Sequence, residues 1–418
     1  MRILYAATKC PLPPTNGQAM RTLALVQGLA GLGHEVAYVG FAAETAEAVG
    51  SGGLAAHCQT VELVPARRPV RNVTSGSDAL SRATCALRGQ SYSVRRFRSA
   101  AARAALARQW QAGGFDLAFC DSLYALTNLP AVATPVVLNC HNVEHLIFER
   151  FAELEPGWAK RWYARLEGGA VRRAEGRALG RAQLALACSE TDRALLARLH
   201  PQLELAVVPN VVEVAAEAAS APAGGPAAVV LFQGSMDWYP NRDAVEYFAH
   251  EILPLIRAEQ PAVKFVVAGR NPPRALVEGL AGRTEIEFTG AVAAMEPYLQ
   301  AATLAVVPLR LGSGTRIKIL EACAAGRAVV STTMGAEGLE LRNGGEIALA
   351  DGPTDFARQV ILLLRDRRRR EAMAAAGRAA VSQRYSHAAL RASLQAALAG
   401  WRELRREPAT GPRRGTWA

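Results

Sequence analysis

The sequence predicts an α/β protein made of two tandem domains, each with a doubly wound parallel sheet. A chain of 418 residues is too long for one ordinary hydrophobic core. Short apolar runs alternate with amphipathic helical stretches along its whole length, which is the order of elements in parallel α/β sheets. Val, Ile and Leu fill these runs continuously, as they do in strands buried on both faces.

The first half contains the apolar runs of one sheet, with helices between them. One such helix is predicted over Gln18–Leu32, and Gly33 would end it. The predicted strands are Arg2–Thr8, Glu35–Phe41, Val61–Pro65, Asp116–Cys120, Pro135–His141, Gln183–Ser189 and Leu205–Pro209. We therefore expect an N-terminal domain over residues 1–212.

The second half repeats this plan after an Ala/Pro/Gly-rich linker predicted over residues 213–226. Its domain is expected over residues 227–385. The predicted strands are Ala228–Phe232, Lys264–Ala268, Ile286–Thr289, Leu304–Pro308, Ala328–Thr332 and Glu346–Ala350. The predicted helices are Asn241–Arg257, Pro273–Leu280, Ala294–Ala302, Arg316–Ala325 and Asp355–Leu364. A helix over 386–404 is expected to pack back towards the N-terminal domain, followed by a loose basic tail over 405–418.

Composition narrows the class of protein. Half of the residues are apolar and 20% are charged, which is normal for a globular protein. No apolar run approaches the ~18 residues that span a bilayer, and the first residues predict a strand instead of a signal peptide. The seven cysteines are scattered without a Cys-x-x-Cys pair. We expect a cytoplasmic protein with reduced thiols.

The net charge of +11 predicts an anionic partner. Nucleic acid is not expected, because no aromatic platform or known binding motif accompanies the basic helical patterns Val94–Gln109, Lys160–Arg181 and Arg365–Arg370. Trp158, Trp162 and Tyr163 stand among arginines, which favours peripheral contact with an anionic membrane at its inner face. An arginine-rich surface that is simply solvated is the alternative.

The segment Gly312–Glu321 predicts a phosphate site. It is a glycine-rich turn between a strand and a helix, where free backbone N–H groups and the positive end of a helix dipole attract anions. Arg316 and Lys318 fall in the expected first turn, where that dipole disfavours cations unless an anion lies between. The alternatives are an ordinary surface pair of Lys318 with Glu321 and a simple N-cap at Ser313.

Further polar and glycine residues follow other predicted strands. In open parallel sheets, ligands bind beyond the carboxyl ends of the strands, so these residues would line one cleft if the two domains face each other. They are Gly17, His141, Gly234, Ser235, Asp237, Arg270 and Asn271.

Two other chemistries have partial matches in the sequence. Gly28, Gly31 and Gly33 end a helix and precede a strand, whereas a dinucleotide fingerprint needs the reverse order, so a nicotinamide enzyme is not expected. His141-Asn-Val-Glu144-His145 matches a metallopeptidase pattern, and a zinc hydrolase using these residues is an alternative. That motif belongs within a helix, however, and His141 is expected to end a strand.

The chain resembles the retaining glycosyltransferases of family 4 (glycosyl transferases group 1), from its first strand to about residue 400. The resemblance implies the GT-B arrangement of two Rossmann-like domains. Its main motifs are Gly234–Asn241 (GSMDWYPN), Val267–Asn271 (VAGRN), Gly312–Glu321 (GSGTRIKILE) and Leu320–Ser331 (LEACAAGRAVVS). Val208–Val211 resembles the strand end before the linker, and His141–Glu144 resembles the N-domain loop that meets the acceptor.

The resemblance implies that a nucleotide-sugar donor is held without a cofactor or metal ion. Glu321 would bind the ribose hydroxyls, while Arg316 and Lys318 would hold the diphosphate and stabilise the leaving phosphate. Gly17 would approach the diphosphate, and His141 would contact the sugar or the acceptor. The predicted donor-binding residues are Gly17, Gly234, Ser235, Arg270, Asn271, Ser313, Gly314, Thr315 and Glu321. A glycan or lipid-linked acceptor is expected, in exopolysaccharide or cell-surface glycan synthesis.

The chain departs from the family pattern in two places. The first motif glutamate, eight residues before Glu321, is replaced by Ser313. The usual arginine and lysine after the first strand of the second half are missing, and Ser235 and Pro240-Asn241 stand in that neighbourhood. We expect Arg316 and Lys318 to supply the lost charges from the opposite loop. The departures leave a non-catalytic sugar-nucleotide-binding protein as the second alternative.

Overall fold

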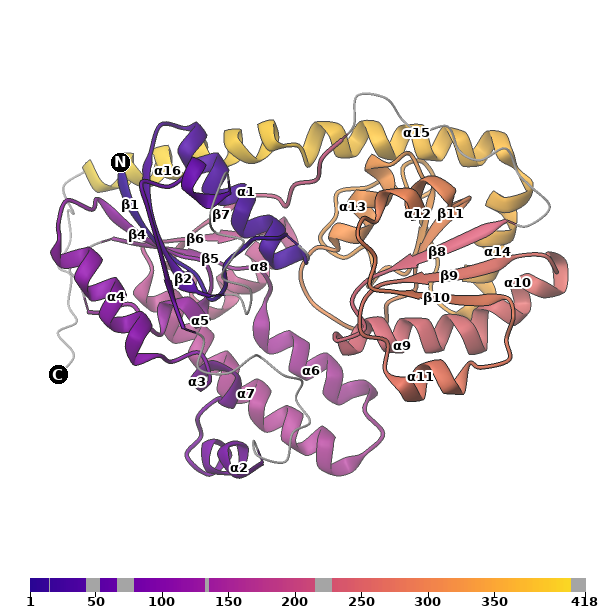
Figure 1. Ribbon diagram of the computed structural model, residues 1–418, viewed down its shortest axis with the longest axis horizontal. Helices are drawn as coiled ribbons and strands as arrows, with labels where there is room; N and C mark the ends of the chain where they lie inside the picture. Colours follow the sequence, from indigo (N-terminus) through magenta and orange to yellow (C-terminus); the bar gives the residue numbers. More distant parts are fainter. Residues whose placement is uncertain (15, 43–52, 66–78, 132–134, 215–227, 407–418) are drawn as a thin grey trace.

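The computed structural model describes residues 1–14, 16–42, 53–65, 79–131, 135–214 and 228–406. Two α/β domains lie side by side, each around one parallel sheet (Figure 1). The predicted fold class is therefore confirmed. The predicted linker, 213–226, and the predicted tail, 405–418, lie largely outside the described residues.

The N-terminal sheet has seven parallel strands in the order β3-β2-β1-β4-β5-β6-β7. Its central strands are buried along almost their whole length, as the continuous apolar runs predict. The strands are β1 (Arg2–Ala6), β2 (Glu35–Phe41), β3 (Thr60–Val64), β4 (Leu117–Cys120), β5 (Val136–Asn139), β6 (Leu184–Ala187) and β7 (Glu204–Val207).

Helices cover both faces of this sheet. α1 begins after Asn16, whose side chain accepts a hydrogen bond from the Ala19 N–H at 3.0 Å, and Gly33 follows its end at φ 77°. The basic segment predicted as one helical pattern over Val94–Gln109 forms two helices, because Ser99 is the N-cap of a new helix. The helices are α1 (Gly17–Gly31), η2 (Leu54–Ala56), α2 (Ala79–Leu87), α3 (Tyr92–Arg95), α4 (Ala100–Gln111), α5 (Leu123–Leu126), α6 (Glu144–Leu154), α7 (Trp158–Arg181) and α8 (Glu190–Leu199).

The C-terminal sheet has six parallel strands in the order β10-β9-β8-β11-β12-β13. Every predicted strand of this half is present. The strands are β8 (Val229–Gln233), β9 (Lys264–Ala268), β10 (Ile286–Gly290), β11 (Leu304–Val307), β12 (Val329–Ser331) and β13 (Ala348–Leu349).

The helices of the C-terminal domain follow the prediction with one difference. The helix expected over Asn241–Arg257 is interrupted by a π-helical turn, η4, just before Pro254, which has no N–H for the helical ladder. The helices are α9 (Tyr239–Tyr247), η4 (Phe248–Ile252), α10 (Leu253–Glu259), α11 (Arg274–Gly279), α12 (Glu296–Ala301), α13 (Ile317–Ala324), α14 (Pro353–Arg365), α15 (Arg367–Arg384) and α16 (His387–Arg406).

The last two helices join the domains. α15 lies along the C-terminal domain and packs against α13, whereas α16 crosses to the N-terminal domain and lies against α1 (Figure 1). The contact is close at Gly28, where an added Cβ would lie 2.9 Å from Cδ2 of Leu390. None of the described helices combines the length and the apolar character that crossing a bilayer requires.

Candidate functional site

Loops at the carboxyl ends of the two sheets touch each other at the Gly312–Thr315 turn. The Val143 N–H of the N-terminal domain donates to Oγ of Ser313 at 3.2 Å, and Asn210 Nδ2 donates to Oγ1 of Thr315. Gly314 has φ 77°, and a Cβ there would lie 2.9 Å from the carbonyl oxygen of His141. Only glycine fits this position. The turn therefore packs directly against the His141 loop of the N-terminal domain.

Arg316 is the N-cap residue of α13 and does not lie in its first turn as predicted. Its backbone is extended, and its guanidinium turns back to donate to the carbonyls of Ser313 and Gly314. Burial lowers the pKa of Arg316 to about 10, which Glu337 opposes. Its Nη2 is buried without a hydrogen-bond partner among the described residues. A buried, unsatisfied guanidinium nitrogen is a donor available to an anion.

Lys318 lies in the first turn of α13 and reaches the loop after β8. Its Nζ donates to Oδ1 of Asn241 at 2.7 Å and lies 4.2 Å from the centre of the Phe232 ring. A Cβ on Gly234 would lie 2.8 Å from this Nζ. Burial and, to a smaller extent, nearby Arg316 lower the pKa of Lys318 to about 7, which Glu321 opposes. The ammonium thus stands beside the place where the family's missing cations are expected.

Glu321 follows one turn later and faces the end of β8. Its Oε2 accepts a hydrogen bond from Nε2 of Gln233 at 2.7 Å, while Oε1 of Gln233 is buried without a partner in the described part of the chain. Burial raises the pKa of Glu321 to about 7, against the effect of Lys318. The carboxylate keeps unused acceptor positions, which suit vicinal hydroxyls.

The remaining predicted donor residues of the C-terminal domain form one polar cluster after β8 and β9. Oγ of Ser235 accepts from Nε of Arg270 at 3.2 Å, and Nδ2 of Asn271 donates to Oδ2 of Asp237 at 2.8 Å. Asn271 has φ 56°, a conformation that asparagine tolerates better than most residues. These side chains lie on the same loop edge as Gly234.

Gly17 lies across from this edge, at the start of α1. An added Cβ would lie 3.1 Å from Cδ1 of Ile317, the first residue of α13. The N-terminal end of α1 therefore faces the N-terminal end of α13, with no side chain at Gly17 to separate them. The two helix ends point positive dipoles into one region.

His141 lies in the N-domain loop after β5 and belongs to a buried network. Its Nε2 is 3.3 Å from Oδ1 of Asp121, which also accepts from the Tyr5 hydroxyl at 2.8 Å. Burial alone would raise the pKa of Asp121, but His141 and the hydrogen bonds from Thr22 and Tyr5 outweigh it and lower that pKa. The ring of His141 is thus fixed by an ionised carboxylate.

The metallopeptidase pattern does not form a metal site. His141 precedes α6, and Nδ1 of His145 pairs with Glu175 at 2.6 Å, away from Asp121. Glu144 accepts from the Tyr124 hydroxyl at 2.8 Å, and burial with Glu175 raises its pKa. No group of three His, Cys, Asp or Glu side chains in the described ranges could hold a metal ion. The two histidines therefore contact different carboxylates, Asp121 and Glu175, and do not face one common site.

Arg21 connects the loops of the N-terminal domain that border the site. It was not predicted from the sequence. It is almost fully buried on α1, and its guanidinium donates to Oδ1 of Asn139 at 2.8 Å, to the Val208 carbonyl at 2.8 Å and to Oδ1 of Asn210 at 3.1 Å. Asn210 in turn contacts Thr315. Arg21 sits within an amphipathic helix, and nothing local distinguishes it from an exposed arginine.

Arg150 of α6 and Glu337 after β12 form a second contact that the sequence does not signal. The guanidinium pairs with both carboxylate oxygens at 2.6 and 2.7 Å and also donates to the carbonyl of Gly312. The pair is bidentate, the strongest geometry for such a contact. It spans the two domains beside the Gly312–Thr315 turn.

Replacing Arg150 with alanine should raise the KM for the predicted nucleotide-sugar donor about tenfold, because a partly buried charge-assisted contact of ~1.5–3 kcal/mol is lost and the turn loses one anchor. A double-mutant cycle with Glu337→Ala should give a coupling of about 1 kcal/mol in the free energy of donor binding. The exposed pair Arg193 and Glu190, 2.6 Å apart within α8, is the matched control and should give almost none. Equal coupling in both pairs would contradict an anchoring role.

Two family models match the chain, one on each domain. The model described as "Glycosyltransferase Family 4" matches residues 15–216, and the model described as "Glycosyl transferases group 1" matches residues 227–366. The second match includes β8, the Gly234–Asn241 loop and all of α13.

Solved structures share the fold over nearly the whole chain. HepE from Anabaena, solved with UDP and glucose, covers 96% of this chain and 99% of its own at 15% identity and a TM-score of 0.63. A sucrose-phosphate synthase from Thermosynechococcus elongatus covers 97% and 99% at 16% identity and a TM-score of 0.70.

A curated relative is an uncharacterised 44.6 kDa protein in the cps region of Klebsiella pneumoniae. It is 26% identical over 140 residues, which are 32% of this chain. The chain thus matches 36% of that relative's length.

Proposed function

Because the chain is a glycosyltransferase that belongs to family 4, we propose that it transfers a sugar from a nucleotide-sugar to a glycan or lipid-linked acceptor with retention of configuration. Exopolysaccharide or cell-surface glycan synthesis is the proposed setting. The relative encoded in a cps region supports that setting for the part of the chain that it matches.

The observation that carries the proposal is the position of Lys318 and Glu321. Both project from the start of α13 towards the end of β8, one cationic and one with free acceptor positions. Their spacing suits a diphosphate next to a ribose. The missing side chains at Gly17 and Gly234 let Ile317 and Lys318 approach these two backbones closely.

We propose the following chemistry. The bond from the anomeric carbon to the leaving phosphate oxygen breaks with its electron pair going to the diphosphate, and the acceptor hydroxyl oxygen bonds to that carbon on the same face. Its proton passes to the leaving phosphate oxygen. Lys318 and Arg316 stabilise the negative charge that develops, and His141 contacts the sugar or acceptor.

Ser313 has a different proposed role from the glutamate it replaces. Its Oγ accepts the Val143 N–H and is buried in the contact between domains. We propose that it fixes the Gly312–Thr315 turn against the N-terminal domain, and that the transferred sugar is recognised by the neighbouring loops instead.

A thermal-shift screen against UDP-, GDP-, ADP- and TDP-sugars tests the donor. UDP-sugars come first because the similar HepE structure was solved with UDP. A donor at 100 times its Kd should stabilise the fold by about 2.7 kcal/mol and raise the Tm, whereas free glucose should not. No shift with any nucleotide-sugar would overturn the proposal.

Nucleotide release separates the enzyme from the non-catalytic alternative. A transferase should release free nucleoside diphosphate when donor and acceptor are both present, and proton NMR of the product should show the anomeric configuration of the donor. Donor binding without nucleotide release with any acceptor would instead favour a sugar-nucleotide-binding protein.

Donor affinity should be greatest near pH 7. The pKa of Lys318 is lowered to about 7, so above that pH the unliganded site must take up a proton to bind a diphosphate, and Kd should rise by up to tenfold per pH unit. The pKa of Glu321 is raised to about 7, so below that pH its carboxylate must lose a proton to accept two hydroxyls. Lys318→Arg should flatten the alkaline limb and Glu321→Gln the acid limb, as measured by calorimetry. A pH-independent Kd in the wild type would contradict both assignments.

A further inference from the structure

The outer side of α7 carries exposed aromatic and cationic residues in line. Trp158 and Trp162 are 78% and 60% exposed, although buried tryptophan is the norm. Arg165 and Arg172 follow at spacings that keep them on the same side of the helix as the two tryptophans. Between and beyond them the line holds only glycines, Gly169 and Gly176. A smooth surface with two protruding rings and a row of cations results.

The charge on α7 is separated between its sides. The helix contains seven Lys and Arg but only two acids, Glu167 and Glu175, and both acids are buried. Glu167 accepts from the hydroxyl of Ser91 at 2.6 Å, and Glu175 accepts from His145. The carboxylates therefore serve internal contacts, and the exposed side of α7 is positive without a compensating acid on the same helix.

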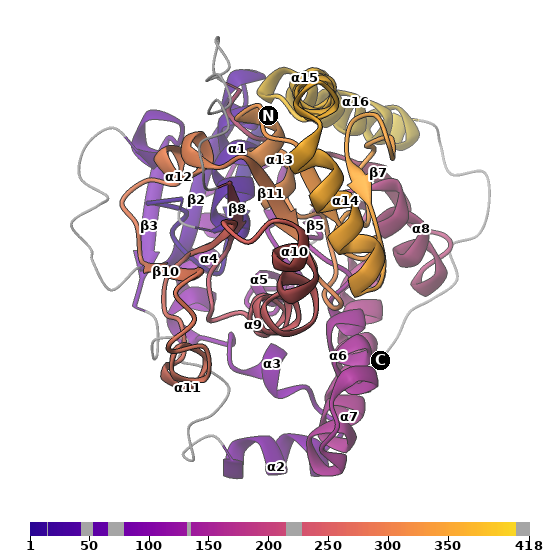
Figure 2. The same ribbon diagram turned by 90° about the vertical axis from the view of Figure 1, so that its right-hand side faces the viewer.

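α2 presents an apolar side next to this helix. Leu80 and Leu87, two turns apart on one side of α2, are 80% and 90% exposed. The opposite side is attached to the domain by buried Cys85 and by Arg82, which lies 5.2 Å from the centre of the Tyr92 ring. Both views place α2 and the beginning of α7 at the same end of the N-terminal domain (Figures 1 and 2).

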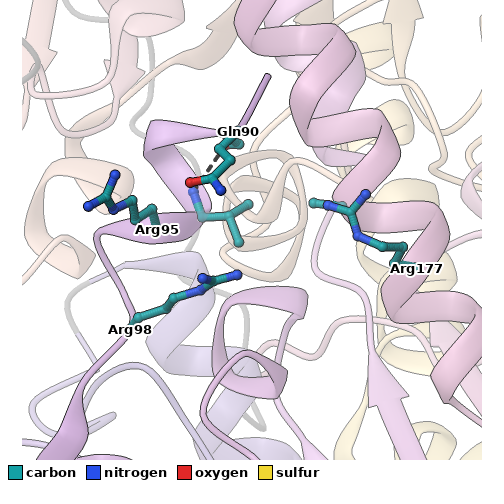
Figure 3. Close-up of a pocket in the computed structure, with 7 residues that line it drawn as sticks. Gln90, Arg95, Arg98 and Arg177 are labelled. Atoms are coloured by element: carbon teal, nitrogen blue, oxygen red, sulfur yellow. Dashed lines mark hydrogen bonds between the residues drawn. The ribbon is translucent and has the colours of Figure 1, made fainter. Parts of the chain in front are cut away.

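A cavity of about 110 Å³ opens between α3 and α7, away from the donor loops. Arg98 and Arg177 extend toward the same space from opposite walls (Figure 3). Neither has a carboxylate within ion-pair distance in the described part of the chain. The volume is below the ~300 Å³ of typical small-molecule sites, but it admits a phosphate group, which two converging arginines favour.

We propose that this surface docks the protein on an anionic lipid bilayer. The docking face comprises Leu80, Leu87, Trp158, Trp162, Arg165 and Arg172. The Arg98–Arg177 cavity is not part of it, because the α7 residues that line the cavity, Ala174 and Arg177, lie on another side of the helix from the row of tryptophans and arginines. The four apolar side chains enter the headgroup–acyl boundary, where tryptophan is favoured. The arginines lie against the negative surface.

The charge of the docking face favours an anionic bilayer as its binding partner. An anionic bilayer offers hydrocarbon and negative charge on one surface, and the docking face offers exposed leucine and tryptophan beside cations. A second copy of the chain would oppose two positive faces, which like-charge repulsion disfavours. The inference does not rest on the donor site, because failure to bind lipid would leave transfer to a soluble acceptor intact.

Vesicle co-sedimentation tests the proposal. The full chain should sediment with vesicles of phosphatidylcholine mixed with phosphatidylglycerol, release at high salt, and stay in solution with phosphatidylcholine alone. Arg165→Gln with Arg172→Gln should weaken partitioning roughly 30-fold, because each cation near an anionic surface contributes about fivefold. Trp158→Ala with Trp162→Ala should weaken it by about tenfold or more.

Arg368→Gln with Arg369→Gln is the matched control. These two exposed arginines lie on α15, at the opposite end of the molecule from α2 in Figure 1, and their replacement removes the same charge. The control should partition like the wild type, and thermal melting should show that all variants fold. The proposal would be overturned if the wild-type protein did not sediment with anionic vesicles. It would also be overturned if the Trp158/Trp162 and Arg165/Arg172 variants bound vesicles like the control, or if the protein bound duplex DNA more tightly than vesicles. A dimer lost only in the tryptophan variant would assign the face to a second copy instead.

Discussion

Replacing Lys318 with alanine should lower kcat/KM by about 10²–10³, the largest effect on activity that we expect. Its ammonium is buried at the start of α13 beside Gly234 and is positioned for the diphosphate. Loss of one such preorganised group typically costs ~2.7–4 kcal/mol of transition-state stabilisation. The loss should appear mainly in kcat, because the leaving phosphate carries more charge in the transition state than in the bound donor.

Lys264→Ala is the matched control for this prediction. Lys264 lies at the exposed start of β9, where its Nζ donates to the carbonyl of Thr284 at 2.9 Å, and its removal should leave turnover unchanged. Arg316→Ala should lower kcat/KM as well, although its guanidinium also supports the Ser313 and Gly314 carbonyls. Unchanged donor affinity and turnover in both the Lys318 and Arg316 variants would refute the idea that they replace the family's missing cations.

Replacing Arg21 with alanine should destabilise the protein by about 3–5 kcal/mol, the largest effect on folding that we expect. Three buried acceptors, on Asn139, Val208 and Asn210, would lose their donor, and each costs ~1–3 kcal/mol when left unsatisfied. A domain has only about 5–15 kcal/mol to lose. The measurement is the urea midpoint followed by circular dichroism.

Two further variants keep this prediction testable if Arg21→Ala fails to fold. Arg21→Lys keeps the charge but not the planar fork, so it should be destabilised less than the alanine variant. Arg103→Ala, at an exposed position of α4, should change the free energy of unfolding by no more than about 0.5 kcal/mol. Equal midpoints for the Arg21 and Arg103 variants would show that the buried network contributes nothing to stability.

The sheets were predictable because their signal is local. A run such as Leu304–Val307 is apolar at every position, and this alone indicates a strand buried on both faces. Helix ends were predictable where a single residue decides them, as Gly33 does after α1. Arg316 was misplaced by one position because a cap and a first turn differ in backbone angles, not in residue type.

The sequence by itself determined the fold class and the segment that carries Lys318 and Glu321, because a strand, a glycine turn and a helix follow one another within that segment. Only the tertiary structure decided what holds this segment in place. Arg150 meets Glu337 across 187 residues, and Ser313 meets Val143 across 170. Such contacts leave no local pattern, because they depend on how two sheets place their carboxyl ends in space. For the same reason, the sequence does not distinguish the buried Arg21 from the exposed arginines of α7. They are the same residue type, but their surroundings in the fold give them opposite roles.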